Sequence, residues 1–447
     1  TDVTLKHVGG YAGLLIAHGA LNRNAAYTNA ALPNWASQIA AAALSDRNSA
    51  ILPLDAPSTV VAGYHVLTDD TIVTNTIGTV NVNRELVKTT GGVGVNSVTF
   101  QAQPTRLVEG GIGQGLAYNA NAKLVPVSAA GFNLSITGLT LDGSNVAGGC
   151  APLLGILAYI DGLTLTNVTC KAFTLEGLSV ILSRNVAHYN GVATDSNGVG
   201  AGEGYGLAHY GCYNVLANNC AFSEGLRRAV TTSYGTSNKW VKDCTAHNTQ
   251  TDSTWDVGAH GLGRGLGCKM SGCISTGVGG GAAFGNLTHG YGDVSPIIQN
   301  CQLNNQDIAV CNDTSGFLID NCTGINRVLF HGEGVRGTDV PNGPNSVGGG
   351  IISNSTMRQL KTSSGGAYAA FRLTSTISVS NSTIDNTADV SLGQPVQLRS
   401  VTTCTITVLG GSIINANAGV EAIYLNGDGA SMTFNMTGAT VRNTWAA

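Results

Sequence analysis

The chain has 447 residues, and it is rich in glycine (61 residues) and poor in charged side chains (11%). Hydrophobic residues reach 43%, which is enough for a large core and argues against a disordered chain. The formal net charge is −4 without a basic block, which excludes the usual footprint of a nucleic-acid-binding protein. Because no apolar run reaches the ~18 residues of a membrane-spanning helix, we expect neither nucleic acid nor membrane as a partner.

The first fifty residues (1–50) predict an N-terminal segment that ends in a short helix. Residues 34–44 carry a helical pattern, and Asn34 is suited to the N-cap position. The chain begins with Thr-Asp-Val-Thr rather than Met and shows no signal peptide. We therefore expect that residues upstream of Thr1 were removed.

Residues 51–55 and 64–67 are typical of strands, and we expect them to be the first strands of the main domain. A helix before them would cover the open end of a solenoid, whose strand edges would otherwise stay unpaired. The stretch 77–131 shows no regular pattern. We predict one main domain over residues 51–440, followed by a tail over residues 441–447.

One short phrase recurs along the rest of the chain. It consists of an apolar residue, any residue, then Asn, Asp or Gly, and then a small residue that is usually buried. Its third position falls on Gly138, Asn167, Asn185, Asn219, Asp243, Gly272, Asn300, Asn321, Asn354, Asn381 and Gly411, with Asn185 in a weaker copy. The spacing is irregular, as expected where each coil of a parallel β-helix inserts its own surface loop.

The chemistry of this phrase explains the predicted fold. Strand alternation points the apolar residue inward, and a left-handed backbone conformation at the third position turns the chain sharply. Gly adopts this conformation freely, and Asn and Asp tolerate it best among the other residues. The sequence therefore predicts an all-β protein, a right-handed parallel β-helix with a short N-terminal capping helix.

The chain has eleven cysteines, and several of them, such as Cys220, Cys244 and Cys273, occupy the fourth position of the phrase. We predict that they stack inside the helix as small buried thiols rather than as disulfides, in a protein made in a reducing cytosol. No coil offers a CxxC pair or a His at ligand spacing, so we expect no metal site and no cofactor.

The sequence resembles the pectate-lyase-like β-helices, in particular the tailspike depolymerases of bacteriophages, over roughly residues 33–440. The predicted helix followed by an apolar strand with Pro is similar to the entry of that family. Residues 224–232, 238–244 and 255–261 resemble a block of many such tailspikes. Two departures leave roles open. Arg228 stands where His is usual, and two extra residues separate Asp256 from His260.

This resemblance implies a homotrimer on the tail of a virion, attached through a missing N-terminal segment. It also implies a bacterial surface polysaccharide as partner, either capsule, exopolysaccharide or O-antigen. The action would be extracellular, on the surface of the host.

Ionisable and aromatic residues gather between residues 195 and 264, on three or four neighbouring coils that can share one groove. The ionisable residues are Asp195, Glu203, His209, Glu224, Arg227, Arg228, Asp243, His247, Asp252, Asp256, His260 and Arg264. The aromatic ones are Tyr205, Tyr210, Tyr234, Trp240 and Trp255. Residues 350–447 carry only scattered charges and are predicted to be scaffold. A simpler interpretation is that Gly-rich loops carry solvated charges.

Two cleavage chemistries fit this set, and the first is hydrolysis. It requires two carboxyl groups that flank the glycosidic bond, one protonated and one ionised. Glu224 and Asp256 lie about one coil apart in the sequence and form the first candidate pair. Glu203 is the substitute for either of them.

The second chemistry is β-elimination from a uronic acid. It requires a cation that neutralises the sugar carboxylate and a base that removes the C5 proton. Arg227 or Arg228 would supply the cation, and His260 or a tyrosine would supply the base. We slightly favour hydrolysis over elimination, because carboxylates are plentiful here.

Further residues are candidates for binding the sugar, because aromatic rings match the apolar faces of sugars. These are Trp255, Tyr205, His209, Tyr234 and Asp195. Each candidate also has a structural interpretation. Trp255 is equally suited to filling a gap between coils, and His260, next to Gly261, to forming a turn.

The sequence thus favours an enzyme that binds and cleaves a bacterial surface polysaccharide. A spike or adhesin that binds the glycan without cleaving it is the second hypothesis. A secreted bacterial lyase or epimerase, expected to be a monomer, is the third.

Overall fold

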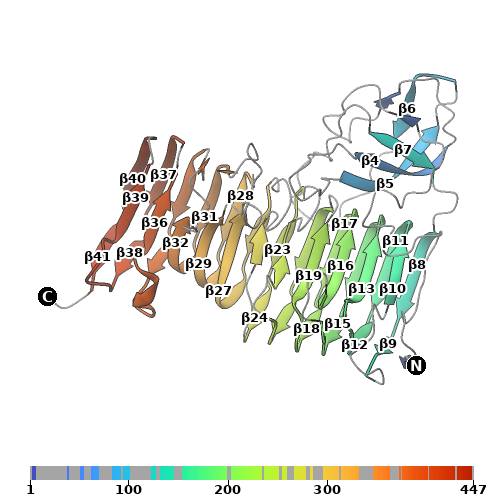
Figure 1. Ribbon diagram of the computed structural model, residues 1–447, viewed down its shortest axis with the longest axis horizontal. Helices are drawn as coiled ribbons and strands as arrows, with labels where there is room; N and C mark the ends of the chain where they lie inside the picture. The colour runs from blue at the N-terminus through green and yellow to red at the C-terminus, as the bar shows by residue number, and fades with distance from the viewer. Residues whose placement is uncertain are drawn as a thin grey trace.

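The computed structural model describes residues 3–6, 38–39, 51–54, 62–69, 83–91, 94–100, 122–126, 131–144, 154–198, 203–233, 236–250, 254–258, 266–277, 282–284, 295–311, 314–331, 346–362, 372–373, 375–400, 402–427 and 430–444. Within these ranges the regular structure is β, apart from the short 3-10 turn η2 (Val390–Leu392). From residue 131 onward the chain winds into a parallel β-solenoid, as predicted. Its coils stack in one row along the long axis (Figure 1).

Three parallel sheets, here called sheets I, II and III, run along the solenoid. Sheet I has twelve strands: β8 (Gly131–Thr137), β11 (Ile160–Thr166), β14 (Arg184–Tyr189), β17 (Tyr213–Asn218), β20 (Ser237–Lys242), β23 (Lys269–Ser271), β26 (Ile297–Gln299), β28 (Phe317–Asp320), β31 (Gly350–Ser353), β34 (Ile377–Ser380), β37 (Cys404–Leu409) and β40 (Met432–Thr437). A single residue in a left-handed conformation then turns the chain into sheet II.

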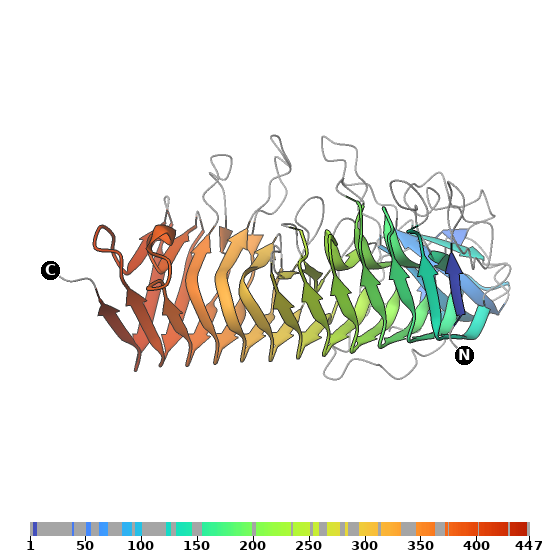
Figure 2. The same cartoon turned by 90° about the horizontal axis from the view of Figure 1, so that it is seen from below.

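Sheets II and III follow sheet I within each coil and share three long strands, β27 (Gln302–Cys311), β29 (Thr323–His331) and β32 (Thr356–Thr362). Sheet II otherwise comprises β1 (Val3–Lys6), β9 (Leu139–Asp142), β12 (Thr169–Lys171), β15 (Val192–Thr194), β18 (Ala221–Ser223), β21 (Thr245–His247), β24 (Ile274–Thr276), β35 (Thr383–Asp385), β38 (Ser412–Asn415) and β41 (Thr440–Asn443). Sheet III otherwise comprises β10 (Leu154–Ala158), β13 (Glu176–Ile181), β16 (Tyr205–Tyr210), β19 (Arg228–Ser233), β22 (Trp255–Asp256), β25 (Ala282–Phe284), β36 (Val396–Arg399) and β39 (Ile423–Asn426). Figure 2 shows the regular stacking of these coils from below.

The corner between sheets I and II confirms the predicted turn. The left-handed residues there are Gly138, Asn167, Asn190, Asn219, Asp243, Gly272, Asn300, Asn321, Asn354, Asn381, Gly410 and Gly438. Neighbouring asparagine side chains bond to one another, as in the 2.9 Å bond that Asn219 Nδ2 donates to Asn190 Oδ1.

Two predicted corner positions were wrong. In the coil of β14 the corner is Asn190 rather than Asn185, and in the coil of β37 it is Gly410 rather than Gly411. Asn185 is also left-handed (φ 55°), but it lies at the entry of sheet I. The true corner was missed because Gly191 follows Asn190 in place of the small inward side chain.

The predicted cysteine ladder is confirmed. Cys220, Cys244, Cys273, Cys301 and Cys322 follow successive corners, and all belong to the core inside the coils. The Cys220 amide donates to Cys244 Sγ at 3.4 Å. Every cysteine whose side chain the structure describes is a buried free thiol.

The region before the solenoid differs from the expectation. Residues 51–54 and 63–69 do not form the first coils. They belong to a separate six-stranded antiparallel sheet: β2 (Gln38–Ile39), β7 (Lys123–Pro126), β4 (Gly63–Asp69), β5 (Asn83–Gly91), β6 (Ser97–Phe100) and β3 (Ile51–Pro53). This N-terminal sheet lies beside the first strands of sheet I (Figure 1).

The predicted capping helix over residues 34–44 is not confirmed. Most of it lies outside the described residues, and Gln38–Ile39 form strand β2, paired antiparallel with β7. At the other end, β41 continues to Asn443, so the predicted tail begins inside a strand. The two-residue strands β30 (Ser346–Val347) and β33 (Arg372–Leu373) form a small separate parallel pair.

The N-terminal sheet has a hydrophobic core and contacts the solenoid through one leucine of that core and through polar groups. Its core includes Leu52 and Leu67, and Leu266 of the solenoid joins it. Tyr64 Oη donates to Asp161 Oδ2 at 2.7 Å, and Arg184 pairs with the same carboxylate at 2.8 Å. Burial and the Asp161 carboxylate raise the pKa of Tyr64 to about 12.

Candidate functional site

Two charged residues of the predicted block, Arg228 and Asp256, lie on the outer face of sheet III. Side chains alternate along each strand, so Val230 and Trp255, which belong to the core, point inward. Their neighbours Thr231 and Asp256 therefore point outward. The outer face of β19 and β22 thus carries a charged group at the centre of the predicted block.

Arg228 and Asp256 form a buried ion pair on this face. Arg228 Nη1 lies 3.0 Å from Asp256 Oδ2, and their side chains are 3% and 2% exposed. Thr231 Oγ1 donates to the same carboxylate oxygen at 2.7 Å. The Arg228 guanidinium also lies over the ring of Tyr205, 5.4 Å from its centroid. The structure therefore brings together three of the sequence-based candidates, Tyr205, Arg228 and Asp256.

A second buried carboxylate lies on the same face, and sequence reasoning missed it. Glu176, on β13, accepts a 2.6 Å hydrogen bond from Tyr210 Oη, and the Glu176 side chain is fully buried. Glu176 aligns with Tyr205, which aligns with Arg228. The sequence could have indicated Glu176 only if the coil boundaries had been known, because its alignment with Tyr205 and Arg228 depends on them. We call Glu176, Tyr205, Tyr210, Arg228, Thr231 and Asp256 the sheet III cluster.

Glu203 and Arg227 lie next to this cluster, at the starts of β16 and β19. The Gly204 carbonyl accepts hydrogen bonds from the amides of Arg227 (2.9 Å) and Arg228 (3.2 Å), which holds the two segments side by side. Both side chains are partly exposed. They therefore flank the buried cluster on the side from which the strands begin.

Glu224 and Asp195 lie elsewhere, at the exposed corner between sheets II and III. Both have left-handed backbones, with φ 55° and 56°. Glu224 accepts from Asn248 Nδ2 at 3.3 Å and lies 3.9 Å from His247 Nε2. It shares neither of these partners with Asp256. The structure therefore does not bring together the carboxylate pair that the sequence favoured.

Trp255 and His209 point into the solenoid rather than toward solvent. Trp255 is 1% exposed, donates to Ser275 Oγ at 2.7 Å and contacts Phe222 edge to face. It fills the space between coils, which was the structural alternative. His209 is 1% exposed, and its Nε2 lies 3.0 Å from Nε2 of His188 on sheet I.

Burial shifts both histidines toward the neutral form. Burial lowers the pKa of His188 to about 4. Burial, together with the charges of His188 and Lys239, lowers the pKa of His209 well below its ordinary value. Two neutral rings can share one hydrogen bond, with one Nε2 donating and the other accepting.

Lys239 is a further interior group that the sequence analysis overlooked. It aligns with Val215 and is fully buried. Its amine donates to the Asp256 carbonyl and lies 3.3 Å from Thr232 Oγ1. The signal was present, since Lys239 has the same strand parity as inward Val241. Lys239 thus holds the backbone of Asp256 from inside the solenoid.

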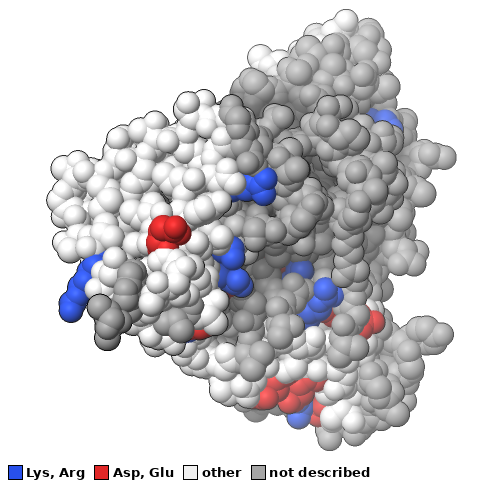
Figure 3. Space-filling view, turned by 60° about the vertical axis from the view of Figure 1, so that its left-hand side comes forward, with Lys and Arg blue, Asp and Glu red and all other residues white. Residues whose placement is uncertain are grey.

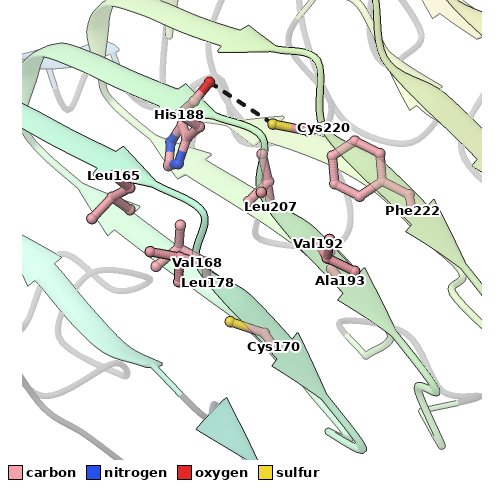
Figure 4. Close-up of a pocket in the computed structure, with 12 residues that line it drawn as sticks. Leu165, Val168, Cys170, Leu178, His188, Val192, Ala193, Leu207, Cys220 and Phe222 are labelled. Carbon is pink, nitrogen blue, oxygen red and sulfur yellow. Dashed lines mark hydrogen bonds between the residues drawn. The ribbon is translucent and has the colours of Figure 1, made fainter. Parts of the chain in front are cut away.

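The small cavity in Figure 4 lies within the coils and is not a substrate site. Leu165, Cys170, His188 and Phe222 are among its lining residues, and its volume is about 10 Å³, room for at most one water. Cys220 Sγ donates to the His188 carbonyl beside it at 3.8 Å.

The remaining sequence-based candidates, Tyr234 and His260, lie outside the described residues, as do Asp252 and Arg264. Among the residues that the structure describes, no group of three or more side chains is arranged to hold a metal ion. In the same part of the chain, no helix has the length and apolar character needed to cross a membrane.

No protein-family model matches the sequence, and no curated protein matches it. Phage tailspikes are among the solved structures to which the chain is similar. Gp49 of Pseudomonas phage LKA1 is one, at 14% identity and a TM-score of 0.42 over 88% of this chain and 67% of gp49.

Two other similar structures are not tailspikes. PfbA, a surface adhesin of Streptococcus pneumoniae, is 13% identical with a TM-score of 0.36, over 70% of this chain and 71% of PfbA. The catalytic domain of a GH87 α-1,3-glucanase is 9% identical with a TM-score of 0.33, over 90% of each chain. Similarity at this level does not transfer a function.

Proposed function

We propose that this protein binds and cleaves a long bacterial surface polysaccharide, with the sheet III cluster as the catalytic centre. The observation that carries the proposal is the buried Arg228–Asp256 pair on the outside of the solenoid. A buried ion pair adds little stability compared with apolar packing. A scaffold could leave these two charges in solvent, so their burial beside Tyr205, Tyr210 and Glu176 favours a functional role.

Hydrolysis is the reaction that we favour. A glycosidase acts through two carboxyl groups, and Asp256 is the one that the cluster supplies in its ionised form. Asp256 is held by Arg228 and Thr231, which stabilise its negative charge, and it is assigned as the base or nucleophile. Glu176, with Tyr210 as its hydrogen-bond donor, is the other carboxyl group of the cluster and lies three strands from Asp256, roughly 14 Å by strand spacing.

Elimination from a uronic acid is the second candidate, and the contact between Arg228 and Tyr205 favours it. Arg228 would neutralise the sugar carboxylate, and Tyr205 would exchange the proton at C5. The two reactions differ in their products, since only elimination leaves an unsaturated uronate that absorbs in the ultraviolet.

The remaining features follow the sequence resemblance and are part of the same proposal. We propose capsule, exopolysaccharide or O-antigen as the substrate, a homotrimer as the assembly, and the virion tail as the location. Light scattering of the purified protein tests the assembly directly, because a trimer has three times the mass of the 45.6 kDa chain.

The experiment is digestion of a panel of bacterial capsules, exopolysaccharides and O-antigens, read by new reducing ends and by ultraviolet absorbance. On the glycan that is cleaved, Asp256→Asn should reduce the rate by about 100-fold or more. Reducing ends without absorbance identify hydrolysis, and both together identify elimination.

The matched control is Asp243→Asn. Asp243 is exposed at the corner between sheets I and II and has a left-handed backbone that Asn adopts equally well. Its rate should stay at the wild-type level. If no glycan is cleaved although binding is retained, the enzyme hypothesis is rejected in favour of a spike that only binds the glycan. Full activity of Asp256→Asn, with melting unchanged, would remove the cluster from the reaction.

A further inference from the structure

One outward-facing row of sheet III continues from Asp256 to the far end of the solenoid. Strand pairing aligns Asp256 with Ala283 and Ala309, and then with Leu329, Lys361, Gln397 and Tyr424. Neighbouring strands lie about 4.8 Å apart, so Lys361 lies roughly 19 Å along the row from Asp256. The two ends of the row therefore share one continuous surface of the sheet.

The chemistry of this row changes along its length. Next to Asp256 it carries small or apolar side chains, and at β32, β36 and β39 it carries Lys361, Gln397 and Tyr424. Tyr424 is 40% exposed, and the other two are partly exposed. Arg399 and Asn426, two residues farther along the same strands, form a parallel row beside it. We call Lys361, Gln397, Arg399, Tyr424 and Asn426 the C-terminal strip.

Lys361 and the neighbouring Arg327 differ in their charged partners. Arg327, in the adjoining strand, forms an ion pair with Asp307, whose carboxylate it binds through Nε at 3.1 Å and through Nη2. Lys361 forms no ion pair among the residues that the structure describes. Partial burial, and to a lesser extent the charge of Arg327, lower the pKa of Lys361. An anion beside Lys361 would favour the charged amine and raise this pKa again.

The remaining side chains of the strip suit a sugar. The exposed face of an aromatic ring matches the apolar face of a pyranose, and the amides of Gln397 and Asn426 both donate to and accept from hydroxyl groups. Lys361 and Arg399 suit carboxylates. Figure 3 shows several Lys and Arg side chains near the middle of the face that is seen when the C-terminal end of the solenoid comes forward. Cations, amides and an exposed aromatic ring on adjacent strands form a recognition surface for an acidic glycan.

We propose that the C-terminal strip binds a carboxylate-bearing polysaccharide, on the same face as the sheet III cluster and about 19 Å from it. The inference rests on the proposed function, because it assumes that one long polysaccharide reaches both the sheet III cluster and the C-terminal strip. It adds that the substrate is acidic, and it assigns a binding role to coils that the sequence analysis had treated as scaffold.

The test measures binding without cleavage. Polygalacturonate, alginate and hyaluronate are each compared with their carboxyl-reduced, neutral forms by affinity electrophoresis and calorimetry, using the full chain. At least one acidic polymer should bind more tightly than its neutral form, with an affinity that falls as salt is added. Lys361→Ala, Arg399→Ala and Tyr424→Ala should each weaken that binding by about tenfold.

Arg442→Ala is the matched control, because Arg442 is exposed on β41 of sheet II, and its affinity should equal that of the wild type. Equal affinity for acidic and neutral forms, no binding to any of the polymers, or unchanged affinity in all three strip variants would overturn the inference. Failure of the proposed function looks different, because binding at the strip then persists while no glycan is cleaved. If Arg442→Ala weakened binding as much as the strip variants do, the assignment of the binding site to the C-terminal strip would also be contradicted.

Discussion

At the scale of single residues, the interior of the solenoid contains polar groups in the coils beneath the sheet III cluster. His188, His209 and Lys239 occupy positions that align with valine or leucine in neighbouring coils. Burying such groups is unfavourable unless they are hydrogen-bonded. The bond between the two imidazoles and the bonds of Lys239 to Asp256 and Thr232 meet this requirement. The interior thus supports the backbone that carries Asp256.

The histidine pair makes stability depend on pH. The folded pKa of His188 is lowered to about 4 from 6.5, so the unfolded chain binds a proton at a higher pH than the folded chain. Stability should therefore fall as pH decreases from about 6.5 to 4, by about 3 kcal/mol for this residue. Thermal melting between pH 7 and 4 measures the loss.

His188→Gln should flatten this pH profile. His247→Gln is the control, because His247 is 53% exposed, and its profile should follow the wild type. A His188→Gln profile as steep as the wild type would mean that other groups cause the acid sensitivity.

At the scale of elements, each coil is set by its corner residue. Asn219 is left-handed (φ 55°), and its side chain bonds to Asn190 in the preceding coil. The backbone conformation and the side-chain ladder therefore depend on the same residue. This is why Asn recurs at the corner even though Gly adopts the conformation more easily.

Substitutions at Asn219 should separate these two contributions. Asn219→Ala should destabilise the protein by about 1–2 kcal/mol, because Ala is strained in the left-handed region. Asn219→Gly keeps the turn and loses only an exposed hydrogen bond, so it should be closer to the wild type. Denaturant unfolding measures both, and an Ala variant as stable as the Gly variant would show that the backbone conformation is not limiting.

At the scale of the whole molecule, the chain combines a parallel solenoid with an antiparallel N-terminal sheet. The described polar contacts between them converge on Asp161, which receives bonds from Tyr64, Arg184 and Asn185. Asp161 and Arg184 belong to the solenoid, and Tyr64 belongs to the N-terminal sheet. A single hydroxyl group therefore links the two parts at this point.

Tyr64→Phe should loosen the N-terminal sheet without affecting distant coils. Loss of one hydrogen bond to a charged group corresponds to about 1.5–3 kcal/mol. Hydrogen exchange should accelerate in β4 and β5, while β37 and β40 serve as the internal control in the same sample. Equal acceleration in all four strands would indicate global destabilisation instead.

The sequence by itself determined the repeating coil, the corner residues and the cysteine ladder. These features are local, because a left-handed turn and an inward small residue are written within four consecutive positions. The exceptions have local causes: Gly191 follows Asn190 in place of a small inward side chain, and Gly411 beside Gly410 is also left-handed. The N-terminal strands were assigned to the wrong sheet, because antiparallel pairing between distant segments leaves no local pattern.

Only the tertiary structure decided which charged residues meet. Arg228 and Asp256 are 28 residues apart, and Glu176 and Tyr210 are 34 apart. Each coil has its own loop length, so these contacts depend on a register between coils that spacing along the sequence does not give. A shift of one residue would turn Asp256 inward and Trp255 outward, because strand side chains alternate between faces. For that reason Trp255, expected to face a sugar, packs in the core, while Asp256 beside it joins Arg228 on the outer face.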